Sequence, residues 1–177
     1  MRVVAGTAKG VKLEAPDGDE IRPTSDRMRE AVFNALFSLG GVEGWNVVDL
    51  FAGTGAMGIE ALSRGATRCT FVERSARARQ LIEANLARAR VDDRAVIVGT
   101  DASTWRGEAD LVIADPPYAF DGWTSLLDGI ASEWLVVESD REIALGDQWS
   151  NVRHKTHGGT VVTFARRAPS PPPGDTG

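Results

Sequence analysis

The sequence has a single cysteine, Cys69, and two histidines among its 177 residues. One thiol cannot form an internal disulfide, and so few Cys and His residues do not suit a structural zinc site. No apolar run comes near the roughly 18 residues of a membrane span, and the N-terminus has no apolar stretch typical of a secretory signal. We therefore expect a cytoplasmic protein with no metal centre and no contact with a membrane.

The chain also lacks the positive net charge typical of nucleic-acid-binding proteins, because 25 acidic residues outnumber 20 lysines and arginines. The formal charge of -5 does not exclude such a partner, since phosphate contacts need only a local basic face. The first twelve residues carry three cations and no acid, and eight arginines between positions 64 and 94 stand against four acids. A solvated helix face is the more ordinary interpretation of the arginines at 77–90, whereas for the N-terminal segment a solvated face and a nucleic-acid contact are equally plausible.

Strand-like and helix-like segments alternate along the chain, which predicts an α/β fold with a mostly parallel sheet. The expected strands are 47–51, 69–73, 95–98, 110–114 and 134–138. The expected helices are 26–39, 56–64, 76–89 and 123–132, the third with Ser75 as its N-cap. Two further strand-like stretches, 152–156 and 160–165, are separated by a Gly-Gly pair and predict an antiparallel hairpin at the end of the sheet.

A glycine-rich segment, Asp49 to Gly58, reads DLFAGTGAMG and lies between an expected strand and an expected helix. Its glycines at 53, 55 and 58 have the spacing G-x-G-x-x-G, which permits a tight turn and a close backbone approach to a ligand. Glu73 ends the next strand about 20 residues downstream and could accept hydrogen bonds from both hydroxyls of a ribose. These features predict an adenosine-containing cofactor and leave NAD and S-adenosylmethionine open.

Asp49 favours S-adenosylmethionine over NAD. A carboxylate at the end of the first strand attracts a ligand with an ammonium and a sulfonium more than one with a pyrophosphate. Phe51 belongs to the same strand end and is a further candidate for the cofactor site. Asp101 follows the third strand, where it could accept a hydrogen bond from the adenine amine or cap the next short helix.

The tetrapeptide Asp115-Pro116-Pro117-Tyr118 directly follows the fourth strand. Ligands of open α/β sheets bind at the carboxyl ends of the strands, so this tetrapeptide should face the same crevice. The Asp115 carboxylate and the Pro116 carbonyl can both accept hydrogens from one NH2 group, and the two prolines stiffen the loop. Tyr118, the only tyrosine, offers a ring on which a base could stack, for roughly 1–3 kcal/mol.

This pattern predicts a methyltransferase that acts on an exocyclic amine of a nucleic-acid base. Such an amine is conjugated with its ring and is a poor nucleophile. Two acceptors that hold its hydrogens would favour a tetrahedral nitrogen, whose lone pair could then attack a sulfonium methyl in line. A paired base would first have to leave its stack.

The motifs also resemble a known family. Residues 49–58 together with 115–118 resemble class I methyltransferases that act on amines. The segments RVVAG at 2–6, RPTSDRMREAVFN at 22–34 and GIEALSRGA at 58–66 look like the RsmD family of bacterial 16S rRNA guanine-N2 methyltransferases. The resemblance implies a seven-stranded Rossmann-like sheet with an N-terminal β-hairpin extension at 1–20 and a methyltransferase domain at 21–167. A Pro-rich tail, 168–177, lies outside it and is expected to be disordered.

The family implies a role for each candidate residue. The substrate would be one guanine of 16S rRNA in the small ribosomal subunit, and the enzyme is expected to be a monomer. The expected S-adenosylmethionine site contains Asp49, Phe51, Gly53, Gly55, Glu73 and Asp101. The expected catalytic loop is Asp115, Pro116, Pro117 and Tyr118. The cations expected to contact RNA are Arg2, Lys9, Lys12, Arg22 and Arg27.

Other functions stay open at this level. The same chemistry could serve a DNA adenine or a protein glutamine, and a non-catalytic RNA-binding or ribosome-assembly factor could keep the fold. An NAD-dependent oxidoreductase is disfavoured by the 115–118 motif and by the lack of a His or Lys pair suited to hydride transfer. The acidic net charge departs from that of a typical RNA-binding enzyme and favours action on a structured ribosomal surface over free RNA.

Overall fold

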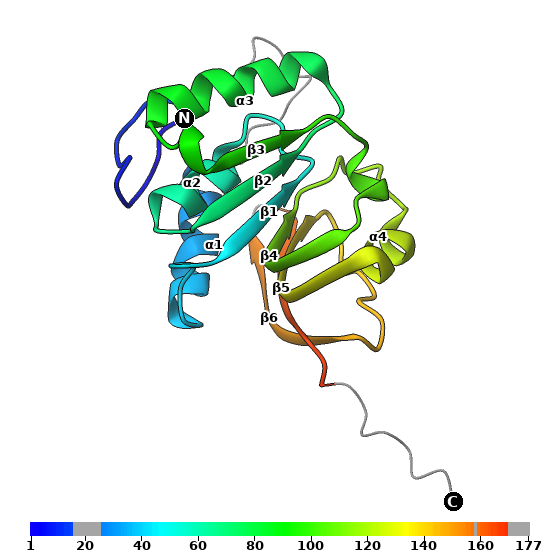
Figure 1. The fold of residues 1–177 in the computed structure, drawn as a ribbon. Helices are drawn as coiled ribbons and strands as arrows, with labels where there is room; N and C mark the ends of the chain where they lie inside the picture. The colour runs from blue at the N-terminus through cyan, green and yellow to red at the C-terminus, as the bar shows by residue number, and fades with distance from the viewer. Residues whose placement is uncertain (16–25, 158, 170–177) are drawn as a thin grey trace, which may run out of the picture.

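The computed structural model describes residues 1–15, 26–157 and 159–169 (Figure 1). Its centre is a seven-stranded sheet in the order β3-β2-β1-β4-β5-β7-β6. The strands are β1 Asn46–Leu50, β2 Arg68–Val72, β3 Ala95–Val98, β4 Gly107–Ala114, β5 Ile130–Ser139, β6 Trp149–His157 and β7 Thr160–Arg167. The α-helices are α1 Asp26–Ser38, α2 Ala56–Ser63, α3 Ala76–Ala89 and α4 Trp123–Gly129, and the 3-10 helices are η1 Asp92–Arg94 and η2 Ala102–Thr104.

The strand directions confirm the predicted fold class. Strands β1 to β5 are parallel, while β7 runs antiparallel to both β5 and β6. The order reverses at β1, which has β2 on one side and β4 on the other. In doubly wound sheets, ligands bind at the carboxyl ends of the strands near such a reversal.

The fourth helix is shorter than the sequence predicts. Helix α4 ends at Gly129 instead of near residue 132, and β5 begins at once with Ile130. Ile130 is buried and pairs with Gly107, which also extends β4 three residues before the predicted start. A β-branched residue with a buried strand position favours the sheet over another helical turn.

Helices cover both faces of the sheet. Helices α1, α2 and α3 pack on one face through apolar residues such as Val32, Ile59 and Ile82 (Figure 1). Helix α4 packs on the other face through Leu126 and Leu127. In the described part of the chain, no helix combines the length and the apolar character needed to cross a membrane.

The N-terminal extension is a turn closed by one antiparallel bridge, between Arg2 and Lys12. It lies along α2, where the amides of Val4 and Ala5 donate hydrogen bonds of 2.8 and 3.0 Å to the Glu60 carboxylate. The side chain of Glu60 is fully buried. The first residues of the chain are therefore part of the packing around α2.

A buried ion pair joins this extension to α1. Arg29, also fully buried, donates from Nε to Glu60 across 3.3 Å and from Nη2 to Asp26 across 2.9 Å. Its guanidinium also donates to the main-chain carbonyl of Arg2. Because breaking one partner of a buried pair costs about 3–5 kcal/mol, this cluster fixes α1, α2 and the extension relative to one another.

Candidate active site

The carboxyl ends of the central strands meet at one edge of the sheet. The strand register aligns Leu50 with Val72 and with Ala114, and Ala114 with Val137. The residues that follow these positions form one row across the edge: Glu73, Phe51, Asp115 and Glu138. The structure thus brings the predicted catalytic aspartate and the predicted cofactor residues to the same place.

The glycine segment turns tightly between β1 and α2. Gly55 has φ +77°, in the left-handed region that favours glycine. Gly58 is needed for a different reason, since a Cβ there would lie 2.3 Å from the Phe71 ring. Gly58 therefore lets α2 pack closely on β2, and its amide donates a hydrogen bond of 2.9 Å to Asp49.

Asp49 lies beneath this turn and is 2% exposed. Burial raises the pKa of Asp49 to about 8, against the effect of the Gly58 N–H, which lowers it. The negative charges of Asp115 and Glu73 raise the pKa further, which shows that the three carboxylates share one electrostatic environment. At neutral pH Asp49 holds its proton unless a cation comes close.

Glu73 connects the glycine turn to the start of α3. Its carboxylate accepts hydrogen bonds from the Gly53 amide at 3.0 Å and from the Ser75 amide at 2.8 Å. Ser75 in turn accepts from the Ala78 amide, which confirms its prediction as the N-cap of α3. The carboxylate predicted to bind a ribose thus lies directly against the backbone of the glycine segment.

Asp101 caps η2. Its carboxylate accepts hydrogen bonds from the amide and the hydroxyl of Ser103, at 2.9 and 2.8 Å, and these bonds lower its pKa. The capping alternative is therefore confirmed. A contact between Asp101 and adenine stays a prediction.

The second half of the 115–118 loop is held by two contacts. Pro116 is buried and Tyr118 is 39% exposed. The hydroxyl of Tyr118 lies 3.0 Å from Oγ1 of Thr160, at the start of β7. The Phe120 amide donates to the Pro117 carbonyl across 2.8 Å. The loop therefore spans the end of β5 and presents the tyrosine ring at the surface of the edge.

Aromatic side chains line part of the same edge. Phe51 has φ +59°, an unfavourable conformation for a residue with a side chain, and such strain is frequent at functional sites. Its ring centroid lies 5.3 Å from that of Phe120, which lies 5.1 Å from that of Trp123. Phe120 was not expected from the sequence, because nothing in the loop after Tyr118 indicates which side chain folds back.

The predicted RNA-binding cations lie in different places. Arg2 donates to the Gly10 carbonyl within the extension. Lys9 lies in the turn that packs on Ser63, at the end of α2 and about 12 Å along that helix from the glycine turn. Arg27 lies on the first turn of α1 beside β6 and β7. Arg22 lies outside the described residues, and the RNA contacts of all these cations stay predictions.

The sheet order, its antiparallel end and the strand-end site define a Rossmann-like class I methyltransferase fold. A solved structure titled "Putative methyltransferase yhhF from Escherichia coli" matches with a TM-score of 0.82 and 31% identity, over 94% of this chain and 97% of that one.

Sequence comparison identifies the family within that class. Residues 1–166 match the family described as Conserved hypothetical protein 95. "Ribosomal RNA small subunit methyltransferase D" of Escherichia coli K12 is 34% identical over 94% of this chain and 90% of its own length. The protein of the same name from Haemophilus influenzae is 27% identical over 93% of this chain and 91% of its own length. The chain belongs to this family, the RsmD family of methyltransferases.

Proposed function

We propose that this protein transfers a methyl group from S-adenosylmethionine to the exocyclic N2 amine of one guanine in 16S rRNA of the small ribosomal subunit. One observation carries the proposal. Asp115 lies in the same row as Glu73 and close enough to Asp49 to raise its pKa, so an amine held by Asp115 would meet a cofactor held by Glu73. The name of the relatives supports an rRNA of the small subunit as the substrate.

The residues at the edge fit S-adenosylmethionine. The Glu73 carboxylate can accept the ribose hydroxyls, and the glycine turn permits the close backbone approach of the ligand. Asp49 supplies a carboxylate whose ionisation is favoured by a cation nearby, which suits the charges of this cofactor. When bound, the cofactor would supply a methyl group on a positively charged sulfur.

The Asp115 carboxylate and the Pro116 carbonyl would position the guanine amine for methyl transfer. Both accept hydrogens from the guanine amine, so the nitrogen lone pair is directed toward the methyl carbon. The nitrogen would become positively charged and acidic on receiving the methyl group, and the sulfur would leave as a neutral thioether. The Asp115 carboxylate can then accept the surplus proton and release it to solvent, so that no strong base is needed.

Tyr118 would hold the base that is being methylated. Its ring is exposed at the edge, while its hydroxyl contacts Thr160 and sets the ring orientation. A guanine that has left its stack can recover part of the lost stacking energy on this ring.

The proposal is tested with radiolabelled S-adenosylmethionine and three substrates: small subunits that lack the modification, protein-free 16S rRNA, and DNA. We expect label in the rRNA of the subunits, on N2 of a single guanine. Label in DNA or on a protein glutamine would show that the substrate is that molecule and not rRNA. Binding to subunits without any methyl transfer would indicate an assembly factor.

A further inference from the structure

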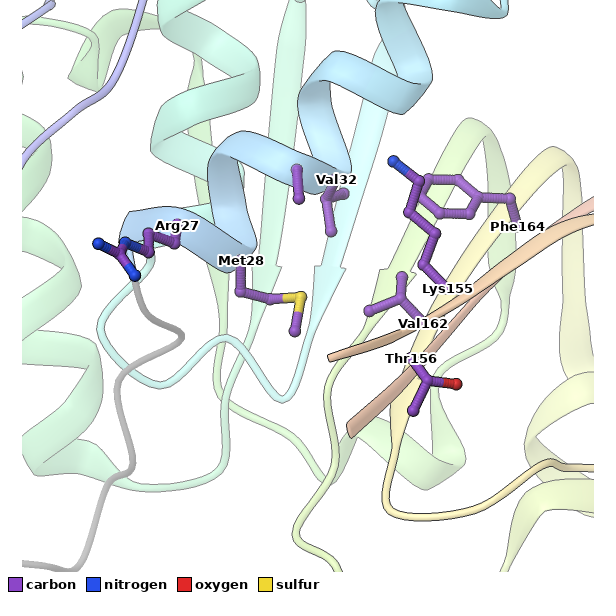
Figure 2. A pocket seen from close by; sticks show the side chains of 8 residues that line it. Arg27, Met28, Val32, Lys155, Thr156, Val162 and Phe164 are labelled. Atoms are coloured by element: carbon purple, nitrogen blue, oxygen red, sulfur yellow. The ribbon is translucent and has the colours of Figure 1, made fainter. Parts of the chain in front are cut away.

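A cleft of about 420 Å³ separates the first turns of α1 from the β6–β7 hairpin (Figure 2). Figure 2 shows Met28 and Val32 of α1 on one side of the cleft and Lys155, Val162 and Phe164 of the hairpin on the other. The cleft is lined by Arg27, Met28, Ala31, Val32, Lys155, Thr156, Val162 and Phe164. Its volume lies within the range of sites for small ligands or single groups of larger ones.

The cleft continues the row of residues at the catalytic edge. Val162 is the ladder partner of Glu138, which lies next to Asp115, and Lys155 pairs with Val162 on its other side. With strands about 4.8 Å apart, Val162 lies about 10 Å and Lys155 about 14 Å from Asp115 along this row. Tyr118 reaches the same hairpin through its contact with Thr160.

The cleft combines cations with an apolar surface. Arg27 and Lys155 are exposed, and none of the salt bridges found among the described residues includes either of them. Among the residues that the structure describes, no acidic side chain lines the cleft, although the whole chain carries a net charge of -5. The acidic residue Glu138 lies outside the cleft lining, between Val162 and Asp115 in the row. Positive charge beside apolar side chains is typical of sites for unpaired nucleotides, which present a phosphate and a flat base.

We propose that this cleft binds the nucleotide next to the target guanine, with its base on Met28 and Val162 and its phosphate at Lys155. This inference rests on the proposed function. A guanine that leaves its stack uncovers the neighbouring base, and the cleft lies where that neighbour would follow. An apolar protein segment would suit the apolar surface of the cleft. It would not account for two exposed cations that form no ion pair with any described residue.

Two substitutions test the cleft by different routes. Lys155→Glu reverses a charge, whereas Ala31→Trp fills the space and leaves the charges in place. Arg68→Glu is the matched control, because Arg68 is exposed at the start of β2, on the opposite edge of the sheet. Melting temperature and S-adenosylmethionine affinity, both expected to equal those of the unmodified protein, report on folding.

We expect Lys155→Glu to raise KM for small subunits on the order of tenfold and to reduce the slope of log KM against log salt by about one. Ala31→Trp should raise KM by a similar factor and leave that slope unchanged. Arg68→Glu should leave both quantities unchanged. Wild-type KM values in both cleft variants would overturn the inference while leaving the proposed function intact.

A crosslink identifies the occupant without relying on methyl transfer. A photoreactive benzoylphenylalanine placed at Asn34 lies one turn beyond Ala31 on α1 and does not line the cleft. We expect it to crosslink to 16S rRNA within a few nucleotides of the methylated guanine. A crosslink to a ribosomal protein, or none, would overturn the inference. Absence of transfer by the unmodified protein would instead overturn the proposed function.

Discussion

The two halves of the catalytic edge are built differently. In the half formed by β1, β2 and β3, the carboxylates of Asp49, Glu73 and Asp101 each accept a backbone N–H, so their positions are set before any ligand arrives. The other half is formed by the loop after β4, by β5, β7 and β6, and by α1. There Tyr118 is 39% exposed, and Arg27 and Lys155 are exposed as well. A small cofactor suits a preformed site, whereas an RNA can bring its own phosphates to exposed cations.

The strongest test of this division is Asp115→Ala. The variant loses an acceptor for the amine, and removal of one such electrostatic contact costs on the order of 10²–10³-fold in rate. We expect methyl transfer to fall by at least that factor while the dissociation constant of S-adenosylmethionine, measured by calorimetry, stays within about twofold. A loss of S-adenosylmethionine affinity as large as the loss of methyl transfer would show that Asp115 belongs instead to the half formed by β1, β2 and β3.

Glu73→Ala should show the opposite pattern. The substitution removes the proposed ribose contacts and the acceptor of two backbone amides. Hydrogen bonds to a charged group are worth about 1.5–3 kcal/mol, so we expect S-adenosylmethionine to bind on the order of 100-fold more weakly. Glu73→Gln, which keeps one acceptor oxygen, is the control and should lose less. If kcat fell at saturating cofactor, Glu73 would also affect the chemical step.

The raised pKa of Asp49 predicts that S-adenosylmethionine affinity depends on pH. Below a pKa of about 8 the free protein holds a proton on Asp49, and a bound cation would favour its release. Cofactor affinity should therefore rise with pH between 6 and 8, by tenfold per unit at most. Calorimetry at pH 7 in buffers of different ionisation enthalpy measures the proton released.

Asp49→Asn is the control for this linkage, and its binding should release no proton from this site. The stability of the cofactor-free protein gives a second measurement. Because the folded pKa lies above the ordinary 3.8, Asp49 makes stability fall as pH rises from about 4 toward 8. Asp49→Asn should remove this contribution. An unchanged pH profile in the variant would show that another group titrates.

Tyr118→Phe should have the smallest effect. It removes the hydroxyl contact with Thr160 and keeps the ring, so a loss of about 1 kcal/mol predicts a KM several-fold higher for the RNA substrate. Tyr118→Ala also removes the proposed stacking and should raise KM further. Steady-state kinetics with small subunits distinguishes the two. Equal effects would assign the role of Tyr118 to its hydroxyl alone.

The sequence indicated the positions of the strand-end carboxylates better than the presence of the cleft, for a physical reason. Asp49, the glycines, Glu73 and Ser75 are local signals, because each belongs to a strand end or a helix start that neighbouring residues define. Its position near the end of a strand could also have indicated Glu138, which lies near the end of β5. The cleft depends on α1 and the hairpin meeting across about 120 residues of chain, and no local pattern reports that contact.

The details that the sequence did not predict also depend on contacts between distant segments. The sequence extended α4 to about residue 132, because it could not show that Ile130 would find a strand partner in Gly107. Nor could the sequence show that the turn packed on Ser63 holds Lys9 at the far end of α2 from the glycine segment, and its contact with RNA stays a prediction. Both cases depend on tertiary packing, which outweighs local preference.

The buried carboxylate of Glu60 has a consequence for the beginning of the chain. Its donors include the amides of Val4 and Ala5 as well as the side chains of Arg29 and Arg64. Deleting the first five residues would expose the middle of α2 at Glu60 to water, only two residues from Gly58, which packs on Phe71. Such a truncation at the surface would act like a mutation in the core, and it should weaken binding of S-adenosylmethionine without altering any residue proposed to contact it.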